Sequence, residues 1–155
     1  MHKFTDNQGD EWSVWVDTRD AKRVRKLVGV DLLLPDLNAM IETLAGDPIA
    51  LVDSLYVICQ EQCQQREISD EEFGRRLVGD AIDAATVALL EALADFFPSR
   101  RSQLLRTLVA KIRAADQRML DRAHAVIADG RLDRAIDREL AKSEQELDAI
   151  LDGGT

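Results

Sequence analysis

The residues best suited to chemistry are two cysteines. Cys59 and Cys63 lie four positions apart, so on a helix they share one face. Two thiols could supply half of a tetrahedral zinc site, but the only histidines are His2 and His124. A disulfide within one helix is geometrically unfavourable. The pair therefore favours buried, unreactive thiols over a metal site.

Carboxylates cluster at two further places, around Asp70-Glu71-Glu72 and at Asp80 and Asp83. Both clusters fit the start of a helix, where negative charge complements the macrodipole. No glycine-rich phosphate loop follows a strand, no serine sits in a nucleophile elbow, and neither histidine is close in sequence to a nucleophile. Sites can also be assembled from distant residues, but the sequence favours a protein that is not an enzyme and holds no cofactor or metal.

The composition predicts one mainly helical domain. The chain has 155 residues, of which 46% are hydrophobic and only 5% aromatic, so its core is built from Leu, Ile, Val and Ala. No window approaches the roughly 20 apolar residues that cross a bilayer, and no signal-peptide core opens the chain. Two cysteines suit a reducing compartment. We expect a cytoplasmic protein with no membrane partner.

Charge alternates along the chain. The net charge of -9 argues against coating nucleic acid through bulk electrostatics. Residues 17–28 carry a net +3, residues 29–97 carry -11, residues 98–122 carry +5 and residues 123–155 carry -4. Such blocks can pair inside a fold or between copies, or they can be solvated helix faces.

The first residues predict a β-hairpin. Trp12, Val14 and Val16 alternate with Trp15, as expected of a strand, and Asn7 and Gly9 suit a turn. A lone hairpin is marginal in water, so it must pack on helices or be extended by a partner strand. One tryptophan can be buried while the other is exposed or at an interface, or both can be packed between helices.

Capping and breaking residues divide the rest of the chain into helices. Asp17 or Thr18 can start a basic helix and Gly29 can end it, Pro35 can open the next helix, and Asp80 can cap another. Asp129-Gly130 interrupts the last helical stretch, and the final three residues are expected to fray. The expected helices cover 17–28, 35–45, 49–64, 69–78, 81–97, 99–128 and 132–151.

The predicted fold is therefore mostly α, a compact helical domain of about six or seven helices with a small N-terminal β-hairpin. Residues 3–128 form the hairpin and helical domain, and residues 129–155 form a C-terminal helical extension. The last helix is amphipathic and needs a partner surface, in its own chain or in another. Its apolar positions are Leu132, Ile136, Leu140, Leu147, Ile150 and Leu151.

Four residues are candidates for contact with a protein partner: Trp12 and Trp15, because aromatic residues are enriched at interfaces, and Arg23 and Arg25 on the basic helix. The basic helix and the pair Arg100-Arg101 could also contact phosphates. Each is short and belongs to an acidic chain, so nucleic-acid binding is disfavoured.

The chain resembles small tail-assembly proteins of tailed phages and prophages over roughly residues 3–113. The segments that carry the resemblance are Phe4-Thr5-Asp6-Asn7 with Trp12-Ser13-Val14, Ala21-Lys22-Arg23-Val24-Arg25, Gly29-Val30-Asp31-Leu32-Leu33, Asp53-Ser54-Leu55-Tyr56-Val57, Ser69-Asp70-Glu71-Glu72-Phe73-Gly74, and Asp80-Ala81-Ile82-Asp83-Ala84-Ala85 running to Phe96-Phe97-Pro98. None of these segments is a catalytic signature.

The resemblance implies a tail assembly chaperone in the bacterial host cytoplasm. Such a protein keeps the tape-measure protein soluble while tail tube subunits polymerise around it, often self-associates, and in many phages has a frameshifted longer form that recruits the tube protein. Two alternatives stay open at this point: a structural or adaptor component of a phage tail or tail-like particle, and a small nucleic-acid-binding regulator.

Overall fold

The computed structural model describes residues 1–128 and 130–153, with the backbone alone for 131 and 132. Asp129, Gly154 and Thr155, where we predicted a helix break and a frayed end, lie outside the described residues, as does the side chain of Leu132. The described chain divides into two units, residues 1–110 and residues 111–155. Our prediction of a domain over residues 3–128 and an extension over residues 129–155 stays a prediction.

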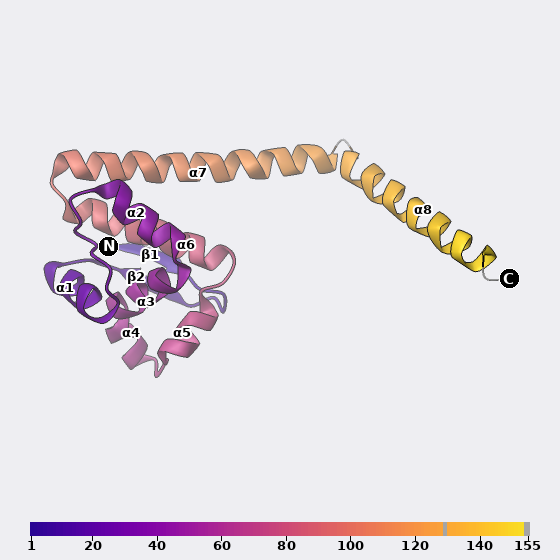
Figure 1. Cartoon of the computed structure of the whole chain (residues 1–155). Coiled ribbons are helices and arrows are strands. Elements are labelled where there is room, and N and C mark those ends of the chain that lie inside the picture. Colours follow the sequence, from indigo (N-terminus) through magenta and orange to yellow (C-terminus); the bar gives the residue numbers. More distant parts are fainter. Residues whose placement is uncertain (129, 154–155) are drawn as a thin grey trace. The chain divides into compact units, whose positions relative to one another are not determined.

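Within the described residues, two strands are followed by eight helices (Figure 1), which confirms the mostly α fold with an N-terminal hairpin. The helix count exceeds the prediction because the expected helix 49–64 is divided at Cys59. The elements are β1 (His2–Thr5), β2 (Glu11–Val14), α1 (Thr18–Leu27), α2 (Leu37–Gly46), α3 (Pro48–Ile58), α4 (Gln60–Gln65), α5 (Asp70–Arg76), α6 (Asp80–Phe96), α7 (Ser99–Ala128) and α8 (Arg131–Asp152).

The strands β1 and β2 form an antiparallel pair in which Phe4 lies opposite Trp12. Asp6 begins the turn by accepting hydrogen bonds from the backbone amides of Gln8 and Asp10, at 2.9 and 3.0 Å. Gly9 has a φ of +89°, which a residue with a side chain adopts only under strain. The turn therefore follows the chemistry predicted from its sequence.

The outer edge of β2 is satisfied by side chains from α4. The amide of Gln62 accepts from the Ser13 N–H at 2.9 Å and donates to the Ser13 carbonyl at 2.8 Å. Arg66 donates to the carbonyl of Glu11 at 2.7 Å. Of the two ways to stabilise the hairpin, packing on helices is the one observed, and these contacts occupy backbone groups that an added strand would need.

The core of the first unit lies between the hairpin and α6. One face of the hairpin, carrying Phe4, Trp12 and Val14, is buried, and β1 packs along α6. Small residues on α6 allow this close approach, because alanine keeps the helix axis near the strands. The buried residues of α6 are Ala81, Ala85, Ala88, Leu89, Leu90, Ala92, Leu93 and Ala94.

Several helix ends differ from the prediction. Asp17 and Asp20 form a reciprocal capping box at the start of α1, and Gly29 has a φ of +84°, both as expected. Pro35, however, precedes the N-cap of α2, which is Asp36. Gly79, not Asp80, is the N-cap of α6, because its φ of +59° suits a glycine and places Asp80 inside the first turn.

The second unit consists of the C-terminal part of α7 and the helix α8. In α7 the last buried residue is Val109, which lies in the first unit. Gly130 has a φ of +70° and its carbonyl accepts from the Arg134 amide at 3.0 Å, so α8 begins directly at this residue. The predicted final helix is therefore present, with its described apolar side chains exposed.

Candidate protein-interaction groove

The two cysteines are buried and poorly suited to reaction. Cys59 lies at the junction of α3 and α4, and Cys63 lies on α4. Burial raises the pKa of Cys59 to about 12 and that of Cys63 to about 11, so both thiols stay protonated near neutral pH. Within the described residues, no group of three or more His, Cys, Asp or Glu side chains is placed to hold a metal ion.

The carboxylate cluster at α5 is used in local structure. The Ser69 hydroxyl accepts from the Glu72 amide at 3.2 Å, which caps the helix. The Glu72 side chain pairs with Arg76 at 3.2 Å and with Arg75 at 3.7 Å. The predicted helix-start role explains this cluster without an acid–base site.

The two tryptophans lie in different environments. Trp12 is fully buried: its indole N–H donates to the Asp6 carboxylate at 2.9 Å, and its ring stacks edge-on to Phe73 at 5.0 Å. Trp12 therefore offers no surface to a partner in this fold. Trp15, on the other face of the chain, is 55% exposed and keeps a surface that a partner could contact.

The two arginines of α1 are paired within the first unit. Arg25 lies 2.9 Å from the carboxylate of Asp31, and hydrogen bonding to Arg25 lowers the pKa of Asp31. Arg23 donates to the side chain of Gln60 and lies 3.9 Å from Asp20. These contacts hold the basic side chains against their own fold, and a role for them in partner binding stays a prediction.

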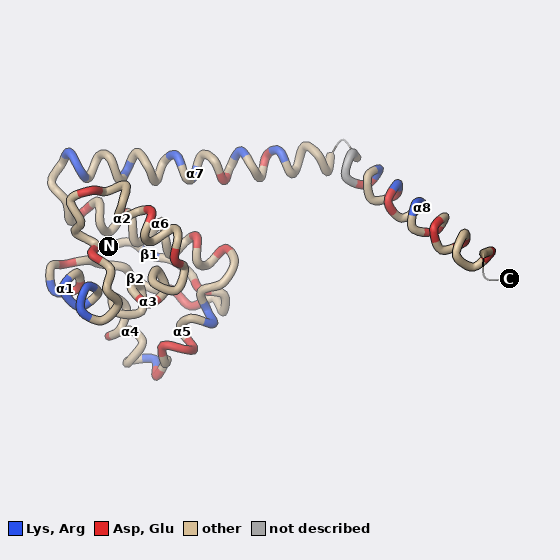
Figure 2. Tube along the Cα trace, in the orientation of Figure 1, with Lys and Arg blue, Asp and Glu red and all other residues tan. Residues whose placement is uncertain are grey.

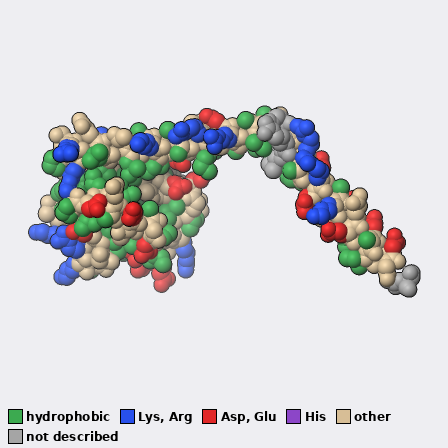
Figure 3. All heavy atoms as spheres, turned by 45° about the horizontal axis from the view of Figure 1, so that its top comes forward, with side chains coloured by type: hydrophobic (Ala, Val, Ile, Leu, Met, Phe, Trp, Pro, Cys, Tyr) green, Lys and Arg blue, Asp and Glu red, His purple; other side chains and the backbone are tan. Residues whose placement is uncertain are grey.

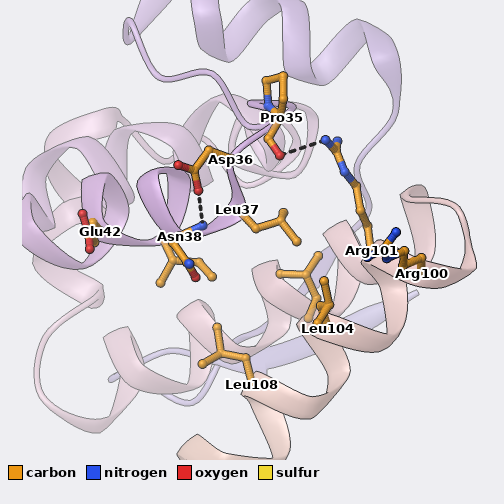
Figure 4. Close-up of a pocket in the computed structure, with 11 residues that line it drawn as sticks. Pro35, Asp36, Leu37, Asn38, Glu42, Arg100, Arg101, Leu104 and Leu108 are labelled. Carbon is orange, nitrogen blue, oxygen red and sulfur yellow. Dashed lines mark hydrogen bonds between the residues drawn. The ribbon is translucent and has the colours of Figure 1, made fainter.

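The first unit contains an apolar groove between α2 and the start of α7 (Figure 4). Its volume is about 690 Å³. The lining residues come from the loop before α2, from α2 itself and from the first turns of α7: Pro35, Asp36, Leu37, Asn38, Ile41, Glu42, Arg100, Arg101, Leu104, Leu105 and Leu108.

Two pairs of aliphatic residues form the walls of this groove. Leu37 and Ile41 are one turn apart on α2, and Leu104 and Leu108 are one turn apart on α7. Leu104 is 58% exposed, whereas Leu105 beneath it is buried. Two such ridges form a slot that can accept the apolar face of a third helix.

The rim of the groove is charged, and hydrogen bonds hold two of its residues, Asp36 and Arg101. Asp36 caps α2 by accepting from the Asn38 amide at 3.0 Å. On the opposite side, Arg101 donates to the Pro35 carbonyl at 2.8 Å and lies 5.3 Å from the Phe97 ring centroid. With Glu42 on the α2 side, the groove has acids along one wall and bases along the other, a pattern that suits an amphipathic helix with mixed flanking charge.

Comparison with protein-family models, with curated proteins and with solved structures finds no significant match for this chain. Among the described residues, no helix is both long enough and apolar enough to span a lipid bilayer.

The groove was not predicted from the sequence. On α2, Met40 and Leu44 are buried, but Leu37 and Ile41 are only partly covered. The available signal was the surplus of aliphatic residues at the start of α7, where Leu104 and Leu108 flank the buried positions. The sequence places these residues on their helices but does not show that α2 and α7 are neighbours.

Proposed function

We propose that this protein is a non-enzymatic tail assembly chaperone of a phage or prophage, which binds an amphipathic helix of a tape-measure-like client in the host cytoplasm. The observation that supports the proposal most is the groove between α2 and α7, with its two aliphatic walls and its charged rim. Such a slot is a helix-binding geometry, and the resemblance to tail-assembly proteins supplies the identity of the client.

The groove can bind a client helix through apolar and charged contacts alone, with no catalytic step. A client helix that inserts its apolar face covers Leu104, the most exposed wall residue, and removes aliphatic surface from water. Its flanking charges meet Asp36 and Glu42 on one side and Arg100 and Arg101 on the other. Charge then sets the orientation of the helix, while apolar contact contributes most of the affinity.

A binding measurement tests the groove directly. We expect a fluorescent peptide of about 20 residues, designed as an amphipathic leucine-rich helix, to bind the intact chain in an anisotropy titration. Leu104→Glu should weaken this binding by roughly tenfold or more, since it places a charge in an apolar contact. The matched control is Leu27→Glu, because Leu27 is 63% exposed on α1 and does not line the groove.

Co-expression tests the chaperone role. A tape-measure protein expressed with the wild-type chain or with Leu27→Glu should give more soluble client than one expressed with Leu104→Glu. The chain should be absent from finished tails, because a chaperone leaves when assembly is complete. A chain that stays in purified particles would instead be a structural component, and a chain that fails to raise client solubility would contradict the proposal.

A further inference from the structure

Both helices of the second unit expose apolar stripes. Figure 3 shows hydrophobic side chains along the surface of both helices. Exposed apolar surface of this extent is typical of an interaction site. The exposed fractions range from 36% to 73%, for Met119, Leu120, Val126 and Ile127 on α7 and for Ile136, Leu140, Leu147, Ile150 and Leu151 on α8.

The charges beside the two stripes are opposite in sign. Helical periodicity places Lys111, Arg118 and Arg122 together along one side of the α7 stripe. On α8 the stripe has acids on both sides, with Asp137 and Glu144 along one flank and Glu139 and Glu146 along the other. Lys142 lies in the same row as Glu139 and Glu146, whereas Arg134 and Arg138 lie on the back of the helix. Figure 2 shows the bases along α7 and the acids toward the end of α8.

Two bases of α8, Arg134 and Arg138, donate hydrogen bonds to the backbone of their own helix. Arg134 donates to the Gly130 carbonyl and Arg138 donates to the Arg134 carbonyl, each at 3.3 Å. Two copies of α8 placed against each other would bring like charges together, so the surface that complements α8 is the basic-flanked stripe of α7.

An antiparallel alignment matches four successive positions of the two stripes, and beyond them it places Val126 opposite Asp133. Both follow the same spacing of four, three and four residues, which places Ile112 opposite Leu147, Met119 opposite Leu140 and Ala123 opposite Ile136. The one polar position in each stripe also coincides, because Asp116 lies opposite Ser143. A shift by one heptad would instead place Asp116 against Ile150, where burial of its charge is unfavourable.

The flanking charges agree with the same alignment. It brings Arg122 beside Glu139 and Arg113 beside Glu144, and it creates no pair of like charges between these flanking positions. Each pair contributes modestly, but the pairs select the register and the partner helix.

The connection between the helices favours a partner in trans. Only two residues separate Ala128 from Arg131. If α8 folded back on its own α7 in this register, the helix axes would be about 8–10 Å apart. The three Cα steps of the connection reach about 11 Å when fully extended, so the connection would be close to its limit. A connection this close to full extension favours exchange of α8 between two copies of the chain. A two-fold arrangement also forms the α7–α8 contact twice, once in each direction.

We propose that residues 111–152 form a homodimer interface, in which α8 of each copy packs antiparallel on α7 of the other. This inference does not rest on the client groove, although the same register places Leu151 opposite Leu108, which also lines the groove. Leu104→Glu tests the groove and Arg122→Glu tests the dimer, so the two proposals fail separately.

Charge exchange tests the proposal and separates a second copy from closure within one chain. The full-length chain should be a dimer by light scattering and sedimentation. Arg122→Glu and Glu139→Arg should each weaken the dimer by roughly tenfold, because two symmetry-related attractions become repulsions. An equimolar mixture of the two variants should regain wild-type affinity, since both contacts in the mixed dimer are attractive. Arg138→Glu, on the back of α8, is the matched control and should leave the dimer unchanged.

Cross-linking gives an independent readout. A chain with Met119→Cys mixed with a chain with Leu140→Cys should form a disulfide-linked dimer on mild oxidation, whereas Lys142→Cys in place of Leu140→Cys should not. Cys59 and Cys63 are buried, and the unmodified chain, oxidised in parallel, gives the background level of cross-linking. A monomer at all concentrations would overturn the proposal. The proposal would also be overturned if Arg122→Glu and Glu139→Arg compensated each other only within one chain. Binding of the α8 stripe to another protein, without binding to a second copy, would overturn it as well.

Discussion

At the residue scale, Trp12 and Trp15 show how residues close in sequence can contribute to the core and to the surface. Trp12 lies in β2, and Trp15 follows Val14, the last residue of that strand. Trp12 fills the space between the hairpin and α5, with its N–H satisfied by Asp6 and the Arg66 guanidinium 4.3 Å above its ring. Trp15 faces the other way and is half exposed. Because only the Trp12 ring is buried, Trp12 contributes to the core and Trp15 does not.

We predict that the two rings contribute very differently to stability. Trp12→Ala should lower the free energy of unfolding by about 3–5 kcal/mol, because it leaves a large cavity. Trp15→Ala should lower it by less than about 1 kcal/mol. Urea titrations followed by circular dichroism measure both. If Trp12→Ala does not fold, Trp12→Phe should still lose about 1–3 kcal/mol, because the Asp6 carboxylate loses a buried donor. Equal losses for Trp12→Ala and Trp15→Ala would contradict this assignment.

At the element scale, a buried ion pair joins the hairpin turn to α5. Arg76 lies 3.3 Å from Asp6, 2.5 Å from Asp10 and 3.2 Å from Glu72, and its carbonyl accepts from the Asn7 amide at 3.0 Å. Burial acts to raise the pKa of Asp6, but hydrogen bonds from Trp12, from two backbone amides and from Arg76 outweigh it, so the pKa is lowered.

The lowered pKa of Asp6 predicts acid sensitivity. Its ordinary value is 3.8, so the ionised form is favoured in the folded chain and its stabilisation is fully present above that pH. The stabilisation should be lost as the pH falls from about 3.8 through the folded-state pKa. The difference in unfolding free energy between wild type and Asp6→Asn should therefore be largest near pH 7 and shrink in acid. A difference that grows in acid would contradict the assignment.

The elements also show what the sequence could predict. Local chemistry was sufficient for the strand alternation, the cap at Asp17 and the glycine at the end of α1. It was insufficient at Cys59, because the apolar periodicity of residues 49–64 continues through the break. There α4 redirects Gln62 and Arg66 onto the edge of β2, a contact between segments far apart in sequence. The groove was missed for the same reason, since it depends on which helices are neighbours.

At the scale of the whole molecule, the buried core and the exposed apolar stripes lie in different units. The first unit contains the buried hairpin, the alanine-rich α6 and the groove, all within residues 1–110. The second unit has almost no buried side chains among those described, but it has complementary stripes. The alternation of charge along the sequence is therefore partly internal, as in the Arg25–Asp31 pair, and partly displayed on exposed helices.

This division predicts that residues 1–110 fold alone as a monomer. The fragment keeps every buried side chain of the first unit, including Leu105 and Val109, so its near-ultraviolet dichroism and urea midpoint should match those of the full chain under dilute conditions. Residues 111–155 alone should be weakly helical when dilute, because isolated helices are marginal in water, and should gain helicity as concentration rises and copies pair. A fragment 1–110 that dimerises as tightly as the full chain would move the interface into the first unit. A fragment that does not fold would show that the second unit contributes to the core.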